Sequence, residues 1–224
     1  PIYTTDAAPG VYNKLACLDW ACRLEPGRKT KFHVCDLYAA PGMDVVYCML
    51  LCGMHLGISC HITGVSIVRA EDDRERFKRM CENVASALTL LPGGECDVDL
   101  RPMSAVQFCK ERSGGAKIDI LLISMPWMTS MGEMHGSAGT LRDPSDMASE
   151  AQELLEILGE SGQCPLVVSL MVPYDHESFR FPGYCLLESV LMRKRSGESG
   201  LEISSYYTRS EEHTSELQSH HDLV

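Results

Sequence analysis

The residues with the clearest potential for chemistry lie in the segment DLYAAPG, residues 36–42, between a buried strand pattern and a helix pattern. Asp36 ends the strand pattern, where its carboxylate could accept a hydrogen bond from a ligand ammonium or hydroxyl group. Small residues let a ligand approach the backbone, and Gly42 can adopt backbone angles that other residues resist. The helix that follows supplies N–H groups for a carboxylate. The turn therefore predicts a site for a ligand that carries an amino acid. Because the pattern is not GxGxxG, it does not favour a dinucleotide.

Helix and strand patterns alternate along the chain, and strand patterns such as residues 118–125 are continuous apolar runs. Such strands are buried on both faces, which predicts one α/β domain with a mostly parallel sheet, helices on both faces and a C-terminal antiparallel hairpin. In such sheets, ligands bind where strands end in helices. Helices are expected at residues 11–24, 43–57, 71–91, 104–112 and 145–162, and strands at residues 31–38, 60–67, 96–103, 118–125, 164–173, 184–195 and 201–208.

The composition is that of a soluble globular domain, with 45% hydrophobic and 23% charged residues. No apolar run reaches the ~18 residues of a membrane-spanning helix, so no membrane partner is expected. The 11 cysteines include no CxxC pair, which predicts reduced thiols in the cytoplasm and argues against a zinc ribbon. The net charge of -11 does not favour nucleic-acid binding, so any RNA would have to meet a local basic patch.

The last residues and the first residue of the sequence bear on where the natural domain begins and ends. The stretch RSEEHTSELQS, residues 209–219, matches the translation of a sequencing adapter. We therefore expect residues 209–224 to be non-native and disordered, and residues 1–208 to form the domain. Because the sequence begins with Pro1, we also expect it to be a piece of a longer polypeptide.

The segment DLYAAPGM resembles the DL-x-AAPGG motif of S-adenosylmethionine-dependent methyltransferases, especially the FtsJ-like RNA ribose 2'-O-methyltransferases of bacteria and RNA viruses. Further matches follow in order over residues 11–208: YNKL, GVSI, DILLISM, VVSLMVPY and SGESGLEISSYY. The resemblance implies a Rossmann-like fold with a seven-stranded sheet, S-adenosylmethionine as cofactor, capped mRNA as substrate and a viral polyprotein as context. The cofactor-binding residues that it implies are Asp36, Tyr38, Ala39, Ala40, Pro41, Gly42, Ser66 and Asp99.

The same resemblance implies the catalytic positions. The family uses a Lys-Asp-Lys-Glu tetrad, whose second lysine helps to deprotonate the ribose 2'-hydroxyl. Here the tetrad positions hold Lys14, Ser124, Ser169 and Glu202. A serine is no base at neutral pH without a base of its own, so we expect methyl transfer to lose roughly the 10²–10⁴-fold typical of general base catalysis.

Three further possibilities remain open. Ser66 replaces the acidic residue that binds the cofactor ribose, and an acid within residues 71–73 could supply that contact instead. The domain could be catalytically inactive and retained in a polyprotein to bind RNA or proteins. Finally, SMPW at residues 124–127 resembles the [DNS]PP[YFW] motif of amino-group methyltransferases such as those acting on adenine N6, in which Trp127 would stack on a flipped base.

Overall fold

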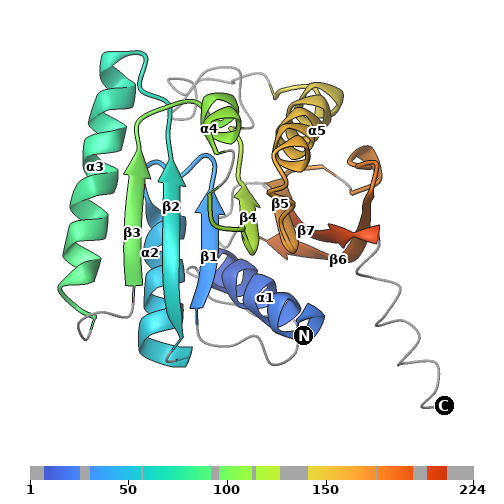
Figure 1. The fold of residues 1–224 in the computed structure, drawn as a ribbon. Helices are drawn as coiled ribbons and strands as arrows, with labels where there is room; N and C mark the ends of the chain where they lie inside the picture. The colour runs from blue at the N-terminus through green and yellow to red at the C-terminus, as the bar shows by residue number, and fades with distance from the viewer. Residues whose placement is uncertain are drawn as a thin grey trace.

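The computed structural model describes residues 8–25, 31–56, 58–91, 96–112, 115–126, 141–174, 176–193 and 201–210. Within these ranges, seven strands form one sheet in the order β3-β2-β1-β4-β5-β7-β6 (Figure 1). Strands β1 to β5 pair in parallel, whereas β7 is antiparallel to both β5 and β6. This arrangement confirms the expected fold class. The strands are β1 (Lys31–Asp36), β2 (Ser59–Val65), β3 (Cys96–Arg101), β4 (Ile120–Ile123), β5 (Val167–Val172), β6 (Tyr184–Arg193) and β7 (Leu201–Arg209).

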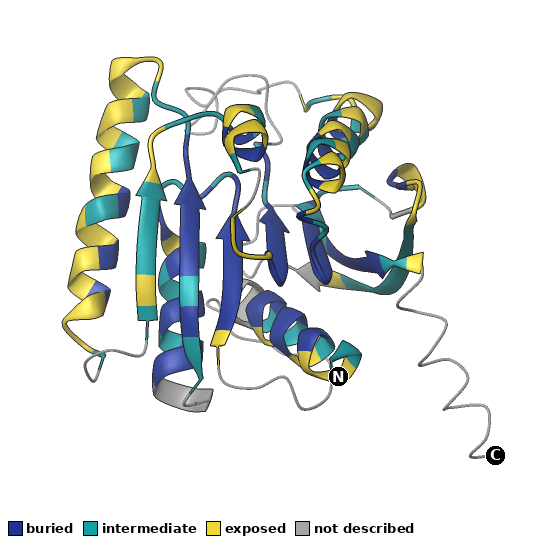
Figure 2. Ribbon diagram, in the orientation of Figure 1, coloured by how far each residue is buried: buried dark blue, intermediate teal, exposed yellow. Residues whose placement is uncertain are grey.

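The positions of β4 and β3 in the sheet agree with their residue patterns. The sequence ILLI of β4 is apolar throughout, and all four residues are buried in the middle of the sheet. The sequence CDVDLR of β3 alternates polar with apolar residues, and this strand lies at the edge, where it is partly exposed (Figure 2). Continuous apolar runs therefore mark strands covered on both faces, as expected for a parallel sheet.

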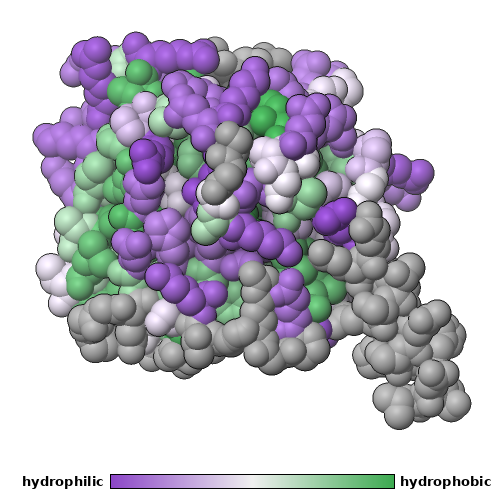
Figure 3. Space-filling model, in the orientation of Figure 1, coloured by the Kyte–Doolittle hydropathy of each residue, from purple (hydrophilic) through white to green (hydrophobic). Residues whose placement is uncertain are grey.

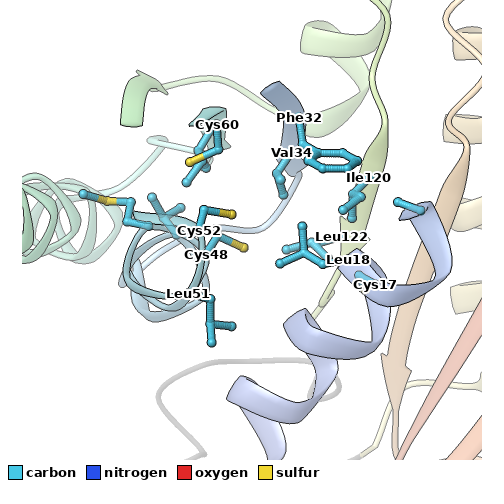
Figure 4. Packing of buried hydrophobic residues seen from close by; sticks show 14 of the residues in the cluster. Cys17, Leu18, Phe32, Val34, Cys48, Leu51, Cys52, Cys60, Ile120 and Leu122 are labelled. Carbon is cyan, nitrogen blue, oxygen red and sulfur yellow. The ribbon is translucent and has the colours of Figure 1, made fainter. Parts of the chain in front are cut away.

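Helices cover both faces of the sheet, and each face has its own apolar cluster. Figure 4 shows part of one cluster, in which Leu18, Val34 and Leu122 come together from a helix and two strands. On the face seen in Figure 3, hydrophilic side chains predominate, with apolar areas between them. None of the helices in the described ranges is long and apolar enough to span a membrane. Helices α1 (Ala8–Leu24), α2 (Met43–Leu50) and α3 (Glu71–Leu88) pack on one face, and α4 (Ala105–Glu111) and α5 (Pro144–Glu160) on the other.

Some helix boundaries differ from those expected. The helix expected at residues 43–57 is divided into α2 and a π-helical segment, η1 (Leu51–Leu56). Helix α5 begins one residue earlier than expected, because the Asp143 carboxylate accepts a hydrogen bond from the Ser145 N–H at 2.8 Å and caps the helix. The expected cap of α4 is confirmed, since Ser104 accepts a hydrogen bond from the Gln107 N–H at 3.1 Å.

The C-terminal hairpin passes the boundary expected at residue 208. Arg209 is still in register with Tyr184 of β6, and the Ser210 N–H donates to the Gly183 carbonyl at 3.0 Å. A short 3-10 turn, η3 (His176–Ser178), lies between β5 and β6. The rest of the expected non-native tail, residues 211–224, lies outside the described ranges.

The turn between β1 and α2 requires a glycine at its last position. Gly42 has a φ of 92°, in the left-handed region that favours glycine. A Cβ atom there would lie 2.8 Å from Met80 Cγ and 3.2 Å from Met80 Cα on α3. The absence of a side chain thus lets the start of α2 pack directly against α3.

We expect Gly42→Ala to lower the free energy of unfolding by roughly 2–4 kcal/mol, because left-handed strain adds to a steric clash. Gly162→Ala is the matched control, since Gly162 has a φ of 72° and no heavy atom lies within 4 Å of the place that a Cβ would take. That variant should lose only about 1–2 kcal/mol in urea denaturation. Equal losses for the two variants would contradict the contact with α3.

Candidate functional site

A row of residues crosses four strands near the carboxyl ends of the parallel strands. Asp36 ends β1 and is in register with Leu122 of β4, which is in register with Ser169 of β5, which in turn is in register with Tyr206 of β7. Leu122 and Tyr206 belong to the apolar cluster beneath α1 and α2. Because partners in register project to the same face, Asp36 and Ser169 project toward these helices as well. Both are buried, so the sheet presents two polar groups to a largely apolar interior.

Helix α1 brings a buried lysine to this row. Lys14 is only 1% exposed, and its Nζ atom lies 2.8 Å from Oδ1 of Asp44, in the first turn of α2. The second oxygen of Asp44, Oδ2, accepts a hydrogen bond from the Ser124 hydroxyl at 3.3 Å. Two of the expected catalytic positions, Lys14 and Ser124, therefore meet through a carboxylate from a third element.

Asn13 links the same lysine to the third expected position. Its Oδ1 accepts a hydrogen bond from Lys14 Nζ at 3.1 Å. Its Nδ2 donates to the hydroxyls of Ser169 at 2.8 Å and Ser204 at 3.1 Å. Three of the four expected catalytic positions thus share one polar network, and Ser169 already has a hydrogen-bond donor from the protein.

The fourth expected catalytic position, Glu202, is described by the structure for its backbone alone. Glu202 lies near the start of β7, in register with Met192 of β6. Its side chain, and all of Trp127, lie outside the described part of the chain. The roles expected for these two residues stay predictions.

The lysine in this network is a fixed cation. Burial acts to lower the pKa of Lys14, but the attraction of Asp44, with further contributions from Cys48 and Asp36, outweighs burial and holds this pKa above its ordinary value. Lys14 is therefore protonated at neutral pH. It can stabilise negative charge but cannot accept a proton.

Only one of the two oxygens of the Asp36 carboxylate has a hydrogen-bond partner among the described residues. Its Oδ1 accepts a hydrogen bond from the Tyr38 N–H at 3.1 Å, whereas Oδ2 is buried without a hydrogen-bond partner among the described residues. Burial, followed by the negative charge of Asp44, raises the pKa of Asp36 to about 7, while Lys14 and the Tyr38 N–H lower it to a smaller extent. A buried oxygen of this kind favours a ligand that donates a hydrogen bond or carries positive charge.

The backbone of the turn is held in place by α3. Arg76 donates a hydrogen bond to the Ala40 carbonyl at 3.2 Å, and Asn83 donates one to the Pro41 carbonyl at 3.0 Å. Both carbonyls therefore have protein partners. The turn keeps Asp36 at its start and the N-terminus of α2 at its end in a fixed relation.

Tyr38 and Ala39 anchor the turn to its surroundings. The Tyr38 hydroxyl donates a hydrogen bond to the Glu150 carboxylate on α5. Ala39 is buried in the apolar cluster, and its N–H donates to the Val65 carbonyl at the end of β2 at 2.9 Å. The Tyr38 side chain is thus directed to α5, and its expected part in cofactor binding stays a prediction.

The other two expected cofactor positions, Ser66 and Asp99, lie directly after β2 and within β3. Ser66 follows β2, is buried, and donates its backbone N–H to the Arg101 carbonyl at 3.0 Å. The Asp99 carboxylate forms an ion pair with Arg101 at 2.6 Å. Of the acids that could replace a ribose contact, Asp73 accepts from the Ala70 N–H at 3.2 Å and so caps α3, while Glu71 is paired with Arg74.

Comparison with known proteins shows which fold the chain has. No protein-family model matches the sequence, and no curated protein matches it either. Among solved structures, the rRNA methyltransferase aviRa from Streptomyces viridochromogenes is 14% identical with a TM-score of 0.58, over 95% of this chain and 87% of that chain. An S-adenosylmethionine-dependent methyltransferase from Agrobacterium tumefaciens is 16% identical with a TM-score of 0.52, over 87% of this chain and 61% of that chain.

The chain has the Rossmann-like methyltransferase fold. At these identities the similarity establishes the fold alone, and the narrower FtsJ-like assignment stays a prediction.

Sequence reasoning missed two residues of the site, Asp44 and Asn13. Asp44 occupies the first turn of α2, where an acidic residue usually stabilises the helix dipole. Its presence there therefore has an ordinary structural explanation and does not indicate a functional site. Asn13 directly precedes Lys14, yet nothing in the sequence shows that both side chains reach the same buried network. In this methyltransferase fold the acid that contacts Lys14 comes from α2, whereas the motif resemblance places it after β4.

We expect Asp36→Asn to stabilise the ligand-free protein at pH 8, because it removes a buried carboxylate. The native pKa of about 7 exceeds the ordinary value of 3.8, so the folded state holds the proton more tightly. The wild-type stability should fall as the pH rises from about 4 to about 7, and the advantage of Asp36→Asn should grow over that window. Thermal unfolding at several pH values measures both effects.

The exposed carboxylate of Asp19, which is 56% exposed, provides the matched control. Asp19→Asn should not reproduce, between about pH 4 and about pH 7, the growing advantage expected of Asp36→Asn. A destabilisation by Asp36→Asn that is equal at both pH values would contradict a strained carboxylate at this position.

We expect Lys14→Met to lower the free energy of unfolding by roughly 3–5 kcal/mol, because it leaves Asp44 and Asp36 without their cation. In an Asp44→Asn background the same substitution should cost at least about 1 kcal/mol less, because the two residues interact directly. A double-mutant cycle by urea denaturation at pH 8 measures this coupling. Additive losses would show that the ion pair contributes nothing to stability.

Proposed function

We propose that this chain is the S-adenosylmethionine-binding domain of an RNA methyltransferase, with capped RNA as the acceptor. The observation that carries the proposal is the buried Asp36 carboxylate, whose Oδ2 has no described partner, beside the turn that opens α2. The fold supports it, because ligands of such sheets bind at the carboxyl ends of the strands. The similarity to an rRNA methyltransferase and the motif resemblance support RNA as the substrate class.

The residues at this edge of the sheet fit the cofactor. The unpartnered oxygen of Asp36 would accept a hydrogen bond from the ammonium group of the methionine moiety, and the first turn of α2 would face its carboxylate. We also propose that Ser66, which is buried directly after β2, contacts the ribose. When bound, the cofactor supplies an activated methyl group to an acceptor atom.

The groups near the acceptor position favour binding over rapid transfer. Lys14 is protonated and paired with Asp44, so its role is to stabilise negative charge. Ser169, where the resemblance expects the proton-accepting lysine, receives a hydrogen bond from Asn13 and has no base beside it among the described contacts. We therefore propose slow transfer to the ribose 2'-hydroxyl at best.

A second candidate function is supported by the same contacts. Lys14, Ser124 and Ser169 all find partners within the protein, which suits a methyltransferase-like domain that binds cofactor and RNA without transfer, as part of a larger polyprotein. An amino-group methyltransferase has less support, because the Ser124 hydroxyl of the SMPW segment is directed to Asp44.

We expect the protein to bind S-adenosylmethionine in calorimetry, and Asp36→Asn to weaken this binding at least tenfold while raising the thermal midpoint at pH 8. Loss of binding together with a gain of stability separates a ligand-binding role from damage to the fold. Asp19→Asn again serves as control and should bind normally. Absence of binding by the wild type, or normal binding by Asp36→Asn, would contradict the cofactor proposal.

A methyl-transfer assay on capped RNA then decides between the candidate functions. Slow label transfer to a ribose 2'-oxygen that is lost in Lys14→Ala supports the enzyme. Cofactor binding with no transfer supports the binding domain. Label on adenine N6 would overturn both in favour of amino-group chemistry.

A further inference from the structure

Two thiols lie side by side across neighbouring strands, away from the site described above. Cys60 of β2 and Cys96 of β3 are in register, and their Sγ atoms are 2.9 Å apart. Residues in register on adjacent strands have Cα atoms about 5 Å apart, which lies within the range that a disulfide spans. The two sulfurs therefore need only a small shift to reach bonding distance, and the strands need not move.

The surroundings distinguish the two thiols. Cys60 is fully buried, and Figure 4 shows its sulfur in the apolar cluster with those of Cys48 and Cys52. Hydrogen bonds with Cys52 and Cys96, followed by burial, raise the pKa of the Cys60 thiol. Cys96 is only half-buried on the edge strand, and its thiol contacts the Met49 carbonyl at 3.6 Å. A small oxidant can thus reach Cys96 before Cys60.

Metal binding does not account for this cluster. No group of three or more histidine, cysteine, aspartate or glutamate residues within the described ranges could hold a metal ion. The exposed polar side chains of edge strand β3 lie on its other face, whereas Cys96, Val98 and Leu100 pack against the apolar cluster.

We propose that Cys60 and Cys96 form a reversible disulfide when the protein meets a low-molecular-weight disulfide such as oxidised glutathione. The Cys96 sulfur attacks one sulfur of the oxidant, giving a mixed disulfide and releasing one glutathione thiol. The Cys60 sulfur then attacks the Cys96 sulfur and releases the second glutathione, which takes up the remaining proton. Two protein thiols lose two hydrogens and two electrons, and one glutathione disulfide becomes two thiols.

The test is peptide mapping of the folded protein after incubation with oxidised glutathione at pH 8. We expect a cross-linked peptide pair that contains Cys60 and Cys96, and its loss on addition of dithiothreitol. Because the bond joins residues 36 positions apart, it should raise the thermal midpoint by roughly 5–15 °C relative to the reduced protein.

Cys96→Ser should abolish both the cross-link and the rise in thermal midpoint, and its position on an edge strand favours normal folding. Cys185→Ser, which removes a half-buried thiol from β6 at the opposite edge of the sheet, should change neither. A Cys52–Cys60 link, a stable glutathione adduct on Cys96, or complete resistance to oxidation would each overturn the proposal.

Discussion

At the carboxyl end of the parallel strands, two carboxylates, Asp36 and Asp44, lie near a single buried ammonium, that of Lys14. The rest of the site depends on this excess of negative over positive groups. Lys14 pairs directly with Asp44, so Asp36 keeps an oxygen without a described partner and a raised pKa. A protein interior tolerates such a group only where its environment is held rigidly or where a ligand completes it. The turn that follows Asp36 provides the rigidity, through Gly42 against α3 and the carbonyl contacts of Arg76 and Asn83.

Under the proposed function, this arrangement would separate cofactor binding from methyl transfer. Groups suited to an ammonium and a carboxylate lie at the turn, while the positions beneath α1 hold a protonated lysine and serines that already have partners. Asp44 restores an acid beside Lys14, although the sequence position expected to hold that acid is Ser124. Nothing among the described contacts places a neutral amine at Ser169. Under the proposed function, the site is better equipped to hold a methyl donor than to activate a hydroxyl acceptor.

The sequence predicted the fold well because its signals are local and strong. The apolar run of β4 and the alternating pattern of β3 distinguish a central strand from an edge strand, and the turn glycine at Gly42 has the unusual φ that its motif suggested. The motif resemblance also assigned Lys14, Ser124 and Ser169 to one site, because three segments match the family motifs in the same order along the chain. In the structure these three residues join one hydrogen-bonded network, and their catalytic roles stay predictions.

What the sequence could not predict depends on side-chain direction across elements. The contacts of Asp44 with Lys14 and Ser124 follow from how α1 and α2 pack on the sheet, and those of Asn13 follow from the pairing of β5 with β7. Tyr38 belongs to the turn, yet its hydroxyl reaches α5. Such contacts join residues distant in sequence, and no local pattern of residue types encodes them.

Carboxyl-carbon NMR of Asp36 during a pH titration would show whether this buried carboxylate has a raised pKa that a cationic ligand lowers. The ligand-free protein should show this carboxyl titrating near pH 7, as its pKa of about 7 requires, and saturating S-adenosylmethionine should move the midpoint well below that. A midpoint near the ordinary value of 3.8 without ligand, or one that the cofactor leaves unchanged, would contradict the account.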